Sequence, residues 1–124
     1  MAITYSIDEE QGLVYSEFSE TIRMDDFHTY FSDLRGNQAF RSDFAGICDW
    51  RKVHNISVEY QGMQTVTSEC PWGRDSYRAI VVSNPVGFGM SRMFQSISDE
   101  SHGTIQIFKG MHEAEAWLNS VRLH

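Results

Sequence analysis

The chain has 124 residues, of which 41% are hydrophobic and 22% charged, a balance typical of a single globular domain. Its net charge of −7 argues against nucleic acid and against an anionic membrane surface as partners, since both are bound through Lys and Arg. The longest aliphatic run, residues 79–82, is far shorter than the ~20 residues that span a bilayer, and the N-terminal residues lack a signal-peptide pattern. We therefore expect one cytoplasmic domain over residues 1–124 that is not an integral membrane protein.

Residues 3–18 predict a β-hairpin. Apolar and polar side chains alternate from Ile3 to Ile7, and residues 13–18 are rich in strand-forming types. The acidic and polar residues between them end at Gly12, which is typical of a tight turn.

Residues 24–37 predict an amphipathic helix, because their apolar side chains recur at a spacing of three and four. Gly36 and Asn37 are typical of a helix C-terminus. Asp25 and Asp26 fall in the first turn, where the helix dipole favours acidic side chains. We therefore interpret this acidic pair as helix-capping residues rather than as a metal site or an acid–base pair.

Residues 44–48 form an apolar stretch that predicts a short buried strand. This strand leads directly into residues 49–51. A polar loop follows. Ser57 is of a residue type that caps helix N-termini, so we expect it to begin a helix that continues to Cys70 and that Pro71 terminates.

The second half of the chain alternates strands and helices. Residues 77–82 predict a strand buried on both faces, residues 88–97 a helix, residues 104–108 a strand, and residues 110–121 a final helix. The complete order is β-β-α-β-α-β-α-β-α. Strands that alternate with helices predict an α/β fold, here with a mostly parallel sheet and an N-terminal β-hairpin.

Candidate binding residues follow from this topology, because ligands of parallel sheets lie beyond the carboxyl ends of the strands. Helices that begin at the same edge present unpaired backbone N–H groups that favour anions. Two arginines near an aromatic and Met-rich helix would suit an anionic head group with an apolar tail. The residues that we expect to bind a ligand or partner are Asp49, Trp50, Arg51, Ser57, Asn84, Phe88 and Arg92.

Structural roles for the same residues stay open. Asp49 and Arg51 are two positions apart, and their alternative role is to pair with neighbouring side chains and tie a loop. The apolar side chains of residues 88–97 are also typical of a helix that packs into the core.

The sequence carries no metal or cofactor motif. The histidines show no paired metal-ligand spacing; they are His28, His54, His102, His112 and His124. Residues 87–89 lack both the third glycine of a dinucleotide loop and the Lys of a P-loop. We therefore expect no cofactor and no metal.

The sequence also gives little indication of catalysis by a cysteine thiol or a serine hydroxyl. Cys48 and Cys70 are interpreted as structural thiols without a disulfide, because both fall in apolar or helix-terminal surroundings. His54 lies between Asp49 and Ser57, the residue types of a hydrolytic triad, but residues this close in one loop rarely reach triad geometry. We expect a non-catalytic protein and keep a hydrolase-type enzyme as a third candidate.

The chain resembles the SpoIIAA-like family, whose fold is shared with STAS domains and has been compared with Sec14-type domains. The resemblance covers nearly the whole chain and rests on residues 25–27, 47–51, 78–82, 88–94, 107–108 and 113–118. In the anti-sigma-antagonist branch, a serine after an Asp-ending strand is phosphorylated. This implies Ser57 as a phosphosite, although the loop is longer here and Arg23 replaces the usual capping hydroxyl of the first helix.

The resemblance and the absence of catalytic motifs favour a STAS-like regulatory or protein-interaction module. The alternative is a binder of a small amphipathic or lipid-like anionic ligand. A homodimer is a further expectation, because the resemblance places most helices on one face of the sheet. Tyr5, Tyr15 and Phe18 would then cover the other face.

Overall fold

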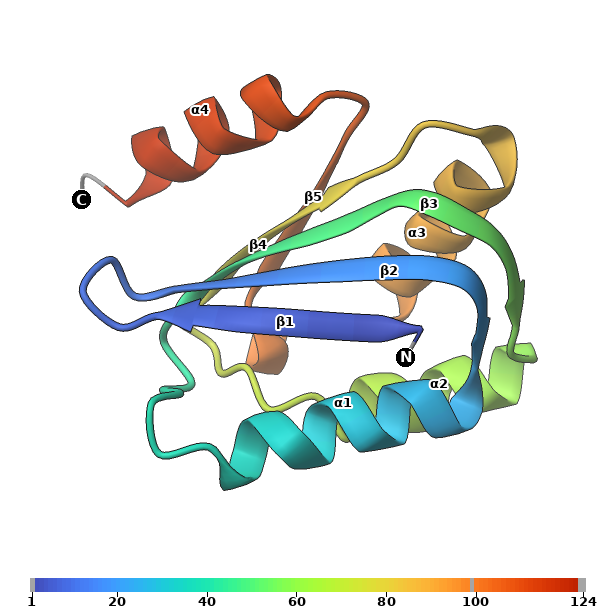
Figure 1. Cartoon of the computed structure of the whole chain (residues 1–124), viewed down its shortest axis with the longest axis horizontal. Helices are drawn as coiled ribbons and strands as arrows, with labels where there is room; N and C mark the ends of the chain where they lie inside the picture. Colours follow the sequence, from blue (N-terminus) through green and yellow to red (C-terminus); the bar gives the residue numbers. More distant parts are fainter. Residues whose placement is uncertain (1, 99, 123–124) are drawn as a thin grey trace.

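A computed structural model describes residues 2–98 and 100–122 of the chain; His124, one of the five histidines, lies outside these ranges. The sheet contains β1 (Ile3–Asp8), β2 (Leu13–Arg23), β3 (Ala45–Ser57), β4 (Tyr77–Val81) and β5 (Thr104–Phe108) in that order (Figure 1). β1 runs antiparallel to β2, and all other neighbours are parallel. The predicted α/β fold with a mostly parallel sheet and an N-terminal hairpin is confirmed.

The hairpin and the first helix form as the pattern predicts. Gly12 occupies the turn with a φ of +63°, a conformation that glycine adopts without steric cost. β2 leads directly into α1 (Met24–Gly36), and the backbone N–H of Arg23 donates to the carboxylate of Asp26 at 2.8 Å. The interpretation of Asp26 as a helix-capping residue is therefore confirmed.

Helices cover both faces of the sheet. α1, α2 (Tyr60–Ser68) and α3 (Pro85–Ile97) pack against one face through a large aromatic core, whereas α4 (Met111–Val121) packs alone on the other (Figure 1). A short 3₁₀ turn, Glu100–His102, precedes β5. Within the described residues, none of the helices has both the length and the apolar character that crossing a bilayer requires.

β3 is much longer than expected. The predicted loop after residue 51 continues as strand to Ser57, because β2, which is also long, pairs with it along that extension. On its other side, β4 pairs with β3 only as far as Asp49. Residues 52–57 therefore pair with a neighbouring strand along one edge only, which explains why their polar sequence is typical of a loop.

The longer strand changes where two of the predicted site residues lie. Trp50 points into the aromatic core and is only 2% exposed, so it is unable to line a surface site. Ser57 ends β3 rather than capping a helix, since α2 begins at Tyr60 with Glu59 at its N-cap position. Ser57 is exposed, and its phosphorylation stays a prediction.

The aromatic residues expected to cover a dimer interface do not share one surface. Phe18 is buried and packs edge-on against Tyr30. Tyr5 faces the same core, and Tyr15 faces the opposite side of the sheet. Residues on one strand alternate between faces, so these three side chains are unable to form the proposed contact together.

Candidate functional site

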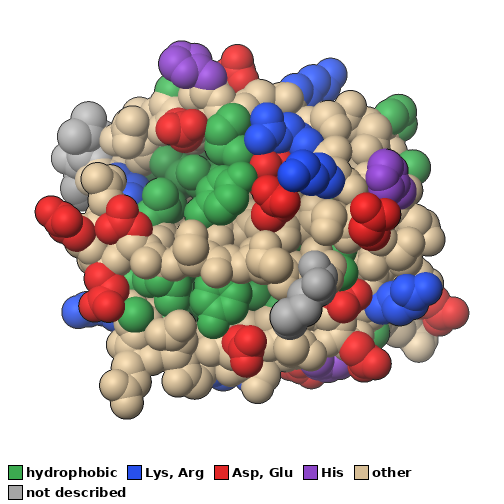
Figure 2. Space-filling model, in the orientation of Figure 1, with side chains coloured by type: hydrophobic (Ala, Val, Ile, Leu, Met, Phe, Trp, Pro, Cys, Tyr) green, Lys and Arg blue, Asp and Glu red, His purple; other side chains and the backbone are tan. Residues whose placement is uncertain are grey.

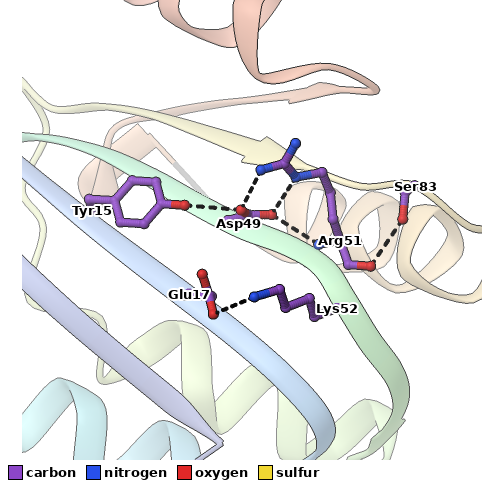
Figure 3. A network of polar contacts seen from close by, with 6 residues as sticks. All are labelled: Tyr15, Glu17, Asp49, Arg51, Lys52 and Ser83. Atoms are coloured by element: carbon purple, nitrogen blue, oxygen red, sulfur yellow. Dashed lines mark hydrogen bonds and ion pairs between the residues drawn. The ribbon is translucent and has the colours of Figure 1, made fainter.

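Asp49 is the centre of a polar network on the face of the sheet that carries α4. Its side chain is only 4% exposed, yet its two oxygens accept four hydrogen bonds (Figure 3). Arg51 donates three of them, from Nε at 2.9 Å, Nη2 at 2.8 Å and the backbone N–H at 3.1 Å, and the Tyr15 hydroxyl donates the fourth at 3.0 Å. The bidentate geometry is that of a strong, oriented ion pair.

Each group of this network is held in one protonation state. Burial by itself would raise the pKa of Asp49, but the hydrogen bonds from Arg51 and Tyr15 outweigh burial and lower the pKa below its ordinary value. Burial and the neighbouring Asp49 carboxylate raise the pKa of Tyr15. Near neutral pH the network therefore consists of a carboxylate, a protonated phenol and a guanidinium, since the Asp49 bonds also raise the pKa of Arg51.

A second ion pair lies beside the first. Lys52 Nζ is 3.2 Å from Glu17 Oε1; the Lys52 side chain is exposed, and that of Glu17 is partly exposed. On the face seen in Figure 2, basic and acidic side chains lie next to one another over the middle of the sheet, beside a hydrophobic patch. Exposed pairs of this kind contribute about 0–1 kcal/mol to stability, so they shape the charge of the surface more than they stabilise the fold.

Hydrogen bonds join the extended part of β3 to the start of α3. The Ser83 hydroxyl donates to the backbone oxygen of Arg51 at 3.0 Å (Figure 3). The Asn84 amide donates to the backbone oxygen of Val53 at 3.1 Å and accepts from the N–H of Gly87 at 2.8 Å. Asn84 is thus the N-cap of α3, and it fixes the helix start relative to the sheet.

An open cleft of about 460 Å³ lies at this helix start, and it is lined by Val82, Ser83, Asn84, Pro85, Phe88 and Lys109. We call it the α3 cleft. Phe88 is 38% exposed, and two cations lie close to its ring. Lys109 Nζ is 5.8 Å and Arg92 Cζ 5.9 Å from the ring centroid, within reach of cation–π attraction.

The structure brings most of the predicted site residues close to the carboxyl end of β4 and the start of α3. Asp49 and Arg51 form the ion pair that was left open as a structural alternative, and the backbone of Arg51 contacts Ser83 beside the α3 cleft. Asn84 and Phe88 line that cleft. The following helix, α3, buries Phe94 in the core and leaves Phe88 exposed. Its packing role is therefore confirmed, and its binding role stays a prediction.

The hydrolytic arrangement is not assembled. Ser57 lies eight residues beyond Asp49 on β3, which at ~3.3 Å per residue places it roughly 26 Å away. The Asp49 carboxylate is bound by Arg51 and Tyr15, and no hydrogen bond connects it to His54. Cys48, on the opposite face, is buried and free, and burial raises the pKa of its thiol to about 12.

Sequence reasoning missed Tyr15 as a partner of Asp49. The two residues are 34 positions apart, and they meet because Tyr15 pairs with Ile47 in the parallel register of β2 and β3. Only that register places the Tyr15 hydroxyl near Asp49, two residues further along β3. No local pattern predicts such a pairing.

No family model and no curated protein matches this sequence. A solved structure does: an uncharacterised protein from Shewanella loihica PV-4, of the DUF3478 family and described as having a SpoIIAA-like fold. The superposition has a TM-score of 0.61 and covers 94% of this chain and 93% of that chain, at 14% sequence identity. The likeness extends over nearly the whole of both chains and concerns the fold alone. The protein therefore has a SpoIIAA-like fold.

Proposed function

We propose that the protein is a non-catalytic, STAS-like interaction module that binds an acidic segment of a partner protein at the α3 cleft. The observation that carries this proposal is the exposed ring of Phe88 at the cleft, with Lys109 and Arg92 beside it. An apolar anchor beside basic side chains is the kind of surface that binds a peptide carrying both an apolar and an acidic side chain.

The charges of the cleft support an acidic partner. The whole chain has a net charge of −7, yet the side chains around Phe88 are basic. Among the described residues, no carboxylate forms an ion pair with Arg92 or Lys109. Arg51, by contrast, is already neutralised by Asp49. Arg92 and Lys109 are thus the cations left to attract an acidic segment.

The hydrogen bonds around the cleft support a preformed site. Asn84 and Ser83 tie the β4–α3 connection to the backbone of β3, so the start of α3 is held before any partner arrives. Preorganised surfaces bind more tightly because less conformational entropy is lost on association. In this proposal the Asp49–Arg51 pair is a support for the cleft rather than a chemical centre.

A small amphipathic anion is the second candidate, because a cleft of about 460 Å³ falls in the size range of small-ligand sites. Its apolar part would lie in the open cleft. The space between α3 and the sheet is filled by the buried Phe94 and by Trp50, whose ring centroids are 6.4 Å apart. Native mass spectrometry of freshly purified protein would reveal such a ligand as an added mass.

The proposal is tested by titrating the ¹⁵N-labelled protein with peptides selected from a display library of acidic and apolar composition. Amide shifts confined to residues 82–88 and to Lys109 are expected. Phe88→Ala and Lys109→Glu should each weaken binding at least about tenfold, as loss of a central anchor or of a charge partner does. Tyr60→Ala is the matched control, since Tyr60 lies on α2 and is the most exposed large hydrophobic among the residues that the structure describes.

Selection of no binding peptide, shifts centred elsewhere, or equal losses in the Tyr60 and Phe88 variants would refute the proposed site. Sedimentation of the same samples at micromolar concentration also tests the predicted homodimer, since a single monomeric boundary would contradict it.

A further inference from the structure

β1 forms an open edge of the sheet, because β2 is its only strand neighbour among the described residues (Figure 1). Proteins commonly protect an edge strand with lysine, proline or a β-bulge. β1 contains neither residue type, and its pairing with β2 runs from Ile3 to Asp8 without a bulge. At the opposite edge, by contrast, the side chain of Gln95 donates to the backbone oxygen of Ile105 on β5 at 2.7 Å. β1 is therefore the edge that is open to a further strand.

The pairing with β2 determines which backbone groups of β1 face this open edge. The N–H of Ser19 donates to the backbone oxygen of Ala2 at 2.9 Å, and the direction of these groups alternates along an antiparallel strand. The N–H and C=O groups that face away from β2 are therefore those of Ile3, Tyr5 and Ile7. Tyr5 and Ile7 are partly exposed, and no hydrogen bond from another described residue reaches their outward backbone groups.

A groove of about 310 Å³ lies along this edge, between β1 and α1, and its lining residues are Ala2, Ile3, Thr4, Tyr5, Asp26, Thr29, Tyr30 and Asp33. Its charged side chains are both acidic. Asp33 is exposed and Asp26 is partly exposed. No described cation forms an ion pair with either of them, so their charge is uncompensated within the part of the chain that the structure describes.

We propose that an extended basic segment of a partner protein adds to β1 as a further strand and places Lys or Arg side chains in this groove. Backbone hydrogen bonds at a free edge supply affinity, and the alternating side chains of the added strand supply specificity. Those on the α1 side would lie beside Tyr5 and Ile7, which pack on the aromatic core. In Figure 2, hydrophobic side chains lie on both sides of the band of polar and backbone atoms where Figure 1 draws β1, so the added strand would also cover apolar surface.

The charges favour a basic partner over a second copy of this chain. Two copies joined through β1 by a two-fold axis would form one continuous sheet with both α1 helices on the same face. Asp26 and Asp33 of each copy would then approach those of the other, and each chain carries a net charge of −7. Like charges brought together at an interface oppose association, whereas opposite charges favour it.

A synthetic peptide in which lysine and valine alternate, about as long as β1, is the probe. Titrated into the ¹⁵N-labelled protein, it should shift the amide signals of residues 3–8 and those near Asp33, and added salt should weaken its binding. A peptide of alternating glutamate and valine should bind at least about tenfold more weakly. This surface is distinct from the α3 cleft and does not depend on the function proposed for that cleft.

Two protein variants test the contribution of the groove. Asp33→Lys should weaken binding of the lysine peptide at least about fivefold, because it replaces an attraction by a repulsion. A lysine near the C-terminus of α1 also suits the helix dipole, so this variant should fold. Glu115→Lys is the matched control. It changes the net charge equally, but Glu115 is exposed on α4, which covers the opposite face of the sheet, and binding should be unchanged.

Methylation of the peptide nitrogen atoms tests the strand pairing itself. Methyl groups on every lysine or on every valine block opposite edges of the extended peptide, so only one of these two peptides should bind. Equal behaviour of the two methylated peptides, equal effects of the two protein variants, or shifts centred away from β1 would overturn the proposal. Shifts of the β1 amides on concentrating the protein alone would assign this edge to a second copy and would also overturn it.

Discussion

Replacing Asp49 by Asn tests the central ion pair of the sheet surface. The substitution keeps the size of the side chain but removes its charge, so the bonds from Arg51 and Tyr15 lose their ionic acceptor. The amide nitrogen of Asn, which is itself a donor, would also face one of the N–H or O–H groups that donate to the carboxylate in the wild-type protein. We therefore expect the variant to fold with a lower free energy of unfolding.

The magnitude follows from the burial of the two partners. Breaking a fully buried ion pair costs about 3–5 kcal/mol, but the Arg51 side chain is 44% exposed and recovers part of its hydration. Hydrogen bonds to charged groups are worth about 1.5–3 kcal/mol, and solvent screening favours the lower end of this range. The expected loss is about 2 kcal/mol at pH 7.

The pH dependence has a definite sign. The pKa of Asp49 is lower in the folded than in the unfolded protein, so its stabilising effect is present above the unfolded carboxyl pKa of about 4. That effect is lost as the pH falls through the lower folded pKa. The difference between wild type and Asp49→Asn should be constant from about pH 5 to pH 8 and should shrink below about pH 4.

Urea unfolding followed by circular dichroism measures both quantities. Arg51→Met and the double variant complete a mutant cycle, and a coupling of about 1–2 kcal/mol is expected for side chains in direct contact. An Asp49→Asn variant within about 0.5 kcal/mol of wild type, or a difference that does not shrink in acid, would refute the assignment of a strong ion pair.

Three further substitutions are checked by the same unfolding assay. Gly46→Ala should destabilise by about 1–3 kcal/mol through overpacking, because its Cβ would press on two buried side chains; an unchanged midpoint would contradict that packing. Asn84→Ala should cost about 1 kcal/mol by removing the cap of α3 and its bond to Val53, whereas wild-type stability would show that the cap is dispensable. Lys52→Ala should change stability by less than about 1 kcal/mol, since its pair with Glu17 is exposed, and a larger loss would reveal a stronger coupling.

The types and order of the main elements could be predicted because they depend on local patterns. Residues 3–7 alternate between apolar and polar, and residues 24–34 repeat at the helical period. Each pattern indicates one face that must be buried, and the structure buries those faces. Asp26 is likewise a local feature, since it accepts from the backbone N–H of the N-cap residue Arg23, three positions before it.

Element boundaries were less predictable where a distant strand decides them. The polar residues 52–57 have no local reason to be extended, and they form strand only because β2 continues alongside them. The same pairing places Trp50 in the core and Asp49 on the surface face. The expectation that Asp49, Trp50 and Arg51 all line one site therefore grouped side chains that the pleat of a strand separates.

For the candidate site, the sequence by itself determined the residue types and the end of the sheet where they gather. Asp49, Arg51, Asn84 and Phe88 were all identifiable because parallel strands place such residues at a common edge. Only the tertiary structure decided which of them meet. The Tyr15–Asp49 bond depends on strand register, and the burial of Arg78 beside Trp72 depends on which face of β4 the aromatic core covers. Register and layer packing are set by contacts between residues far apart in the chain, so no local pattern contains them.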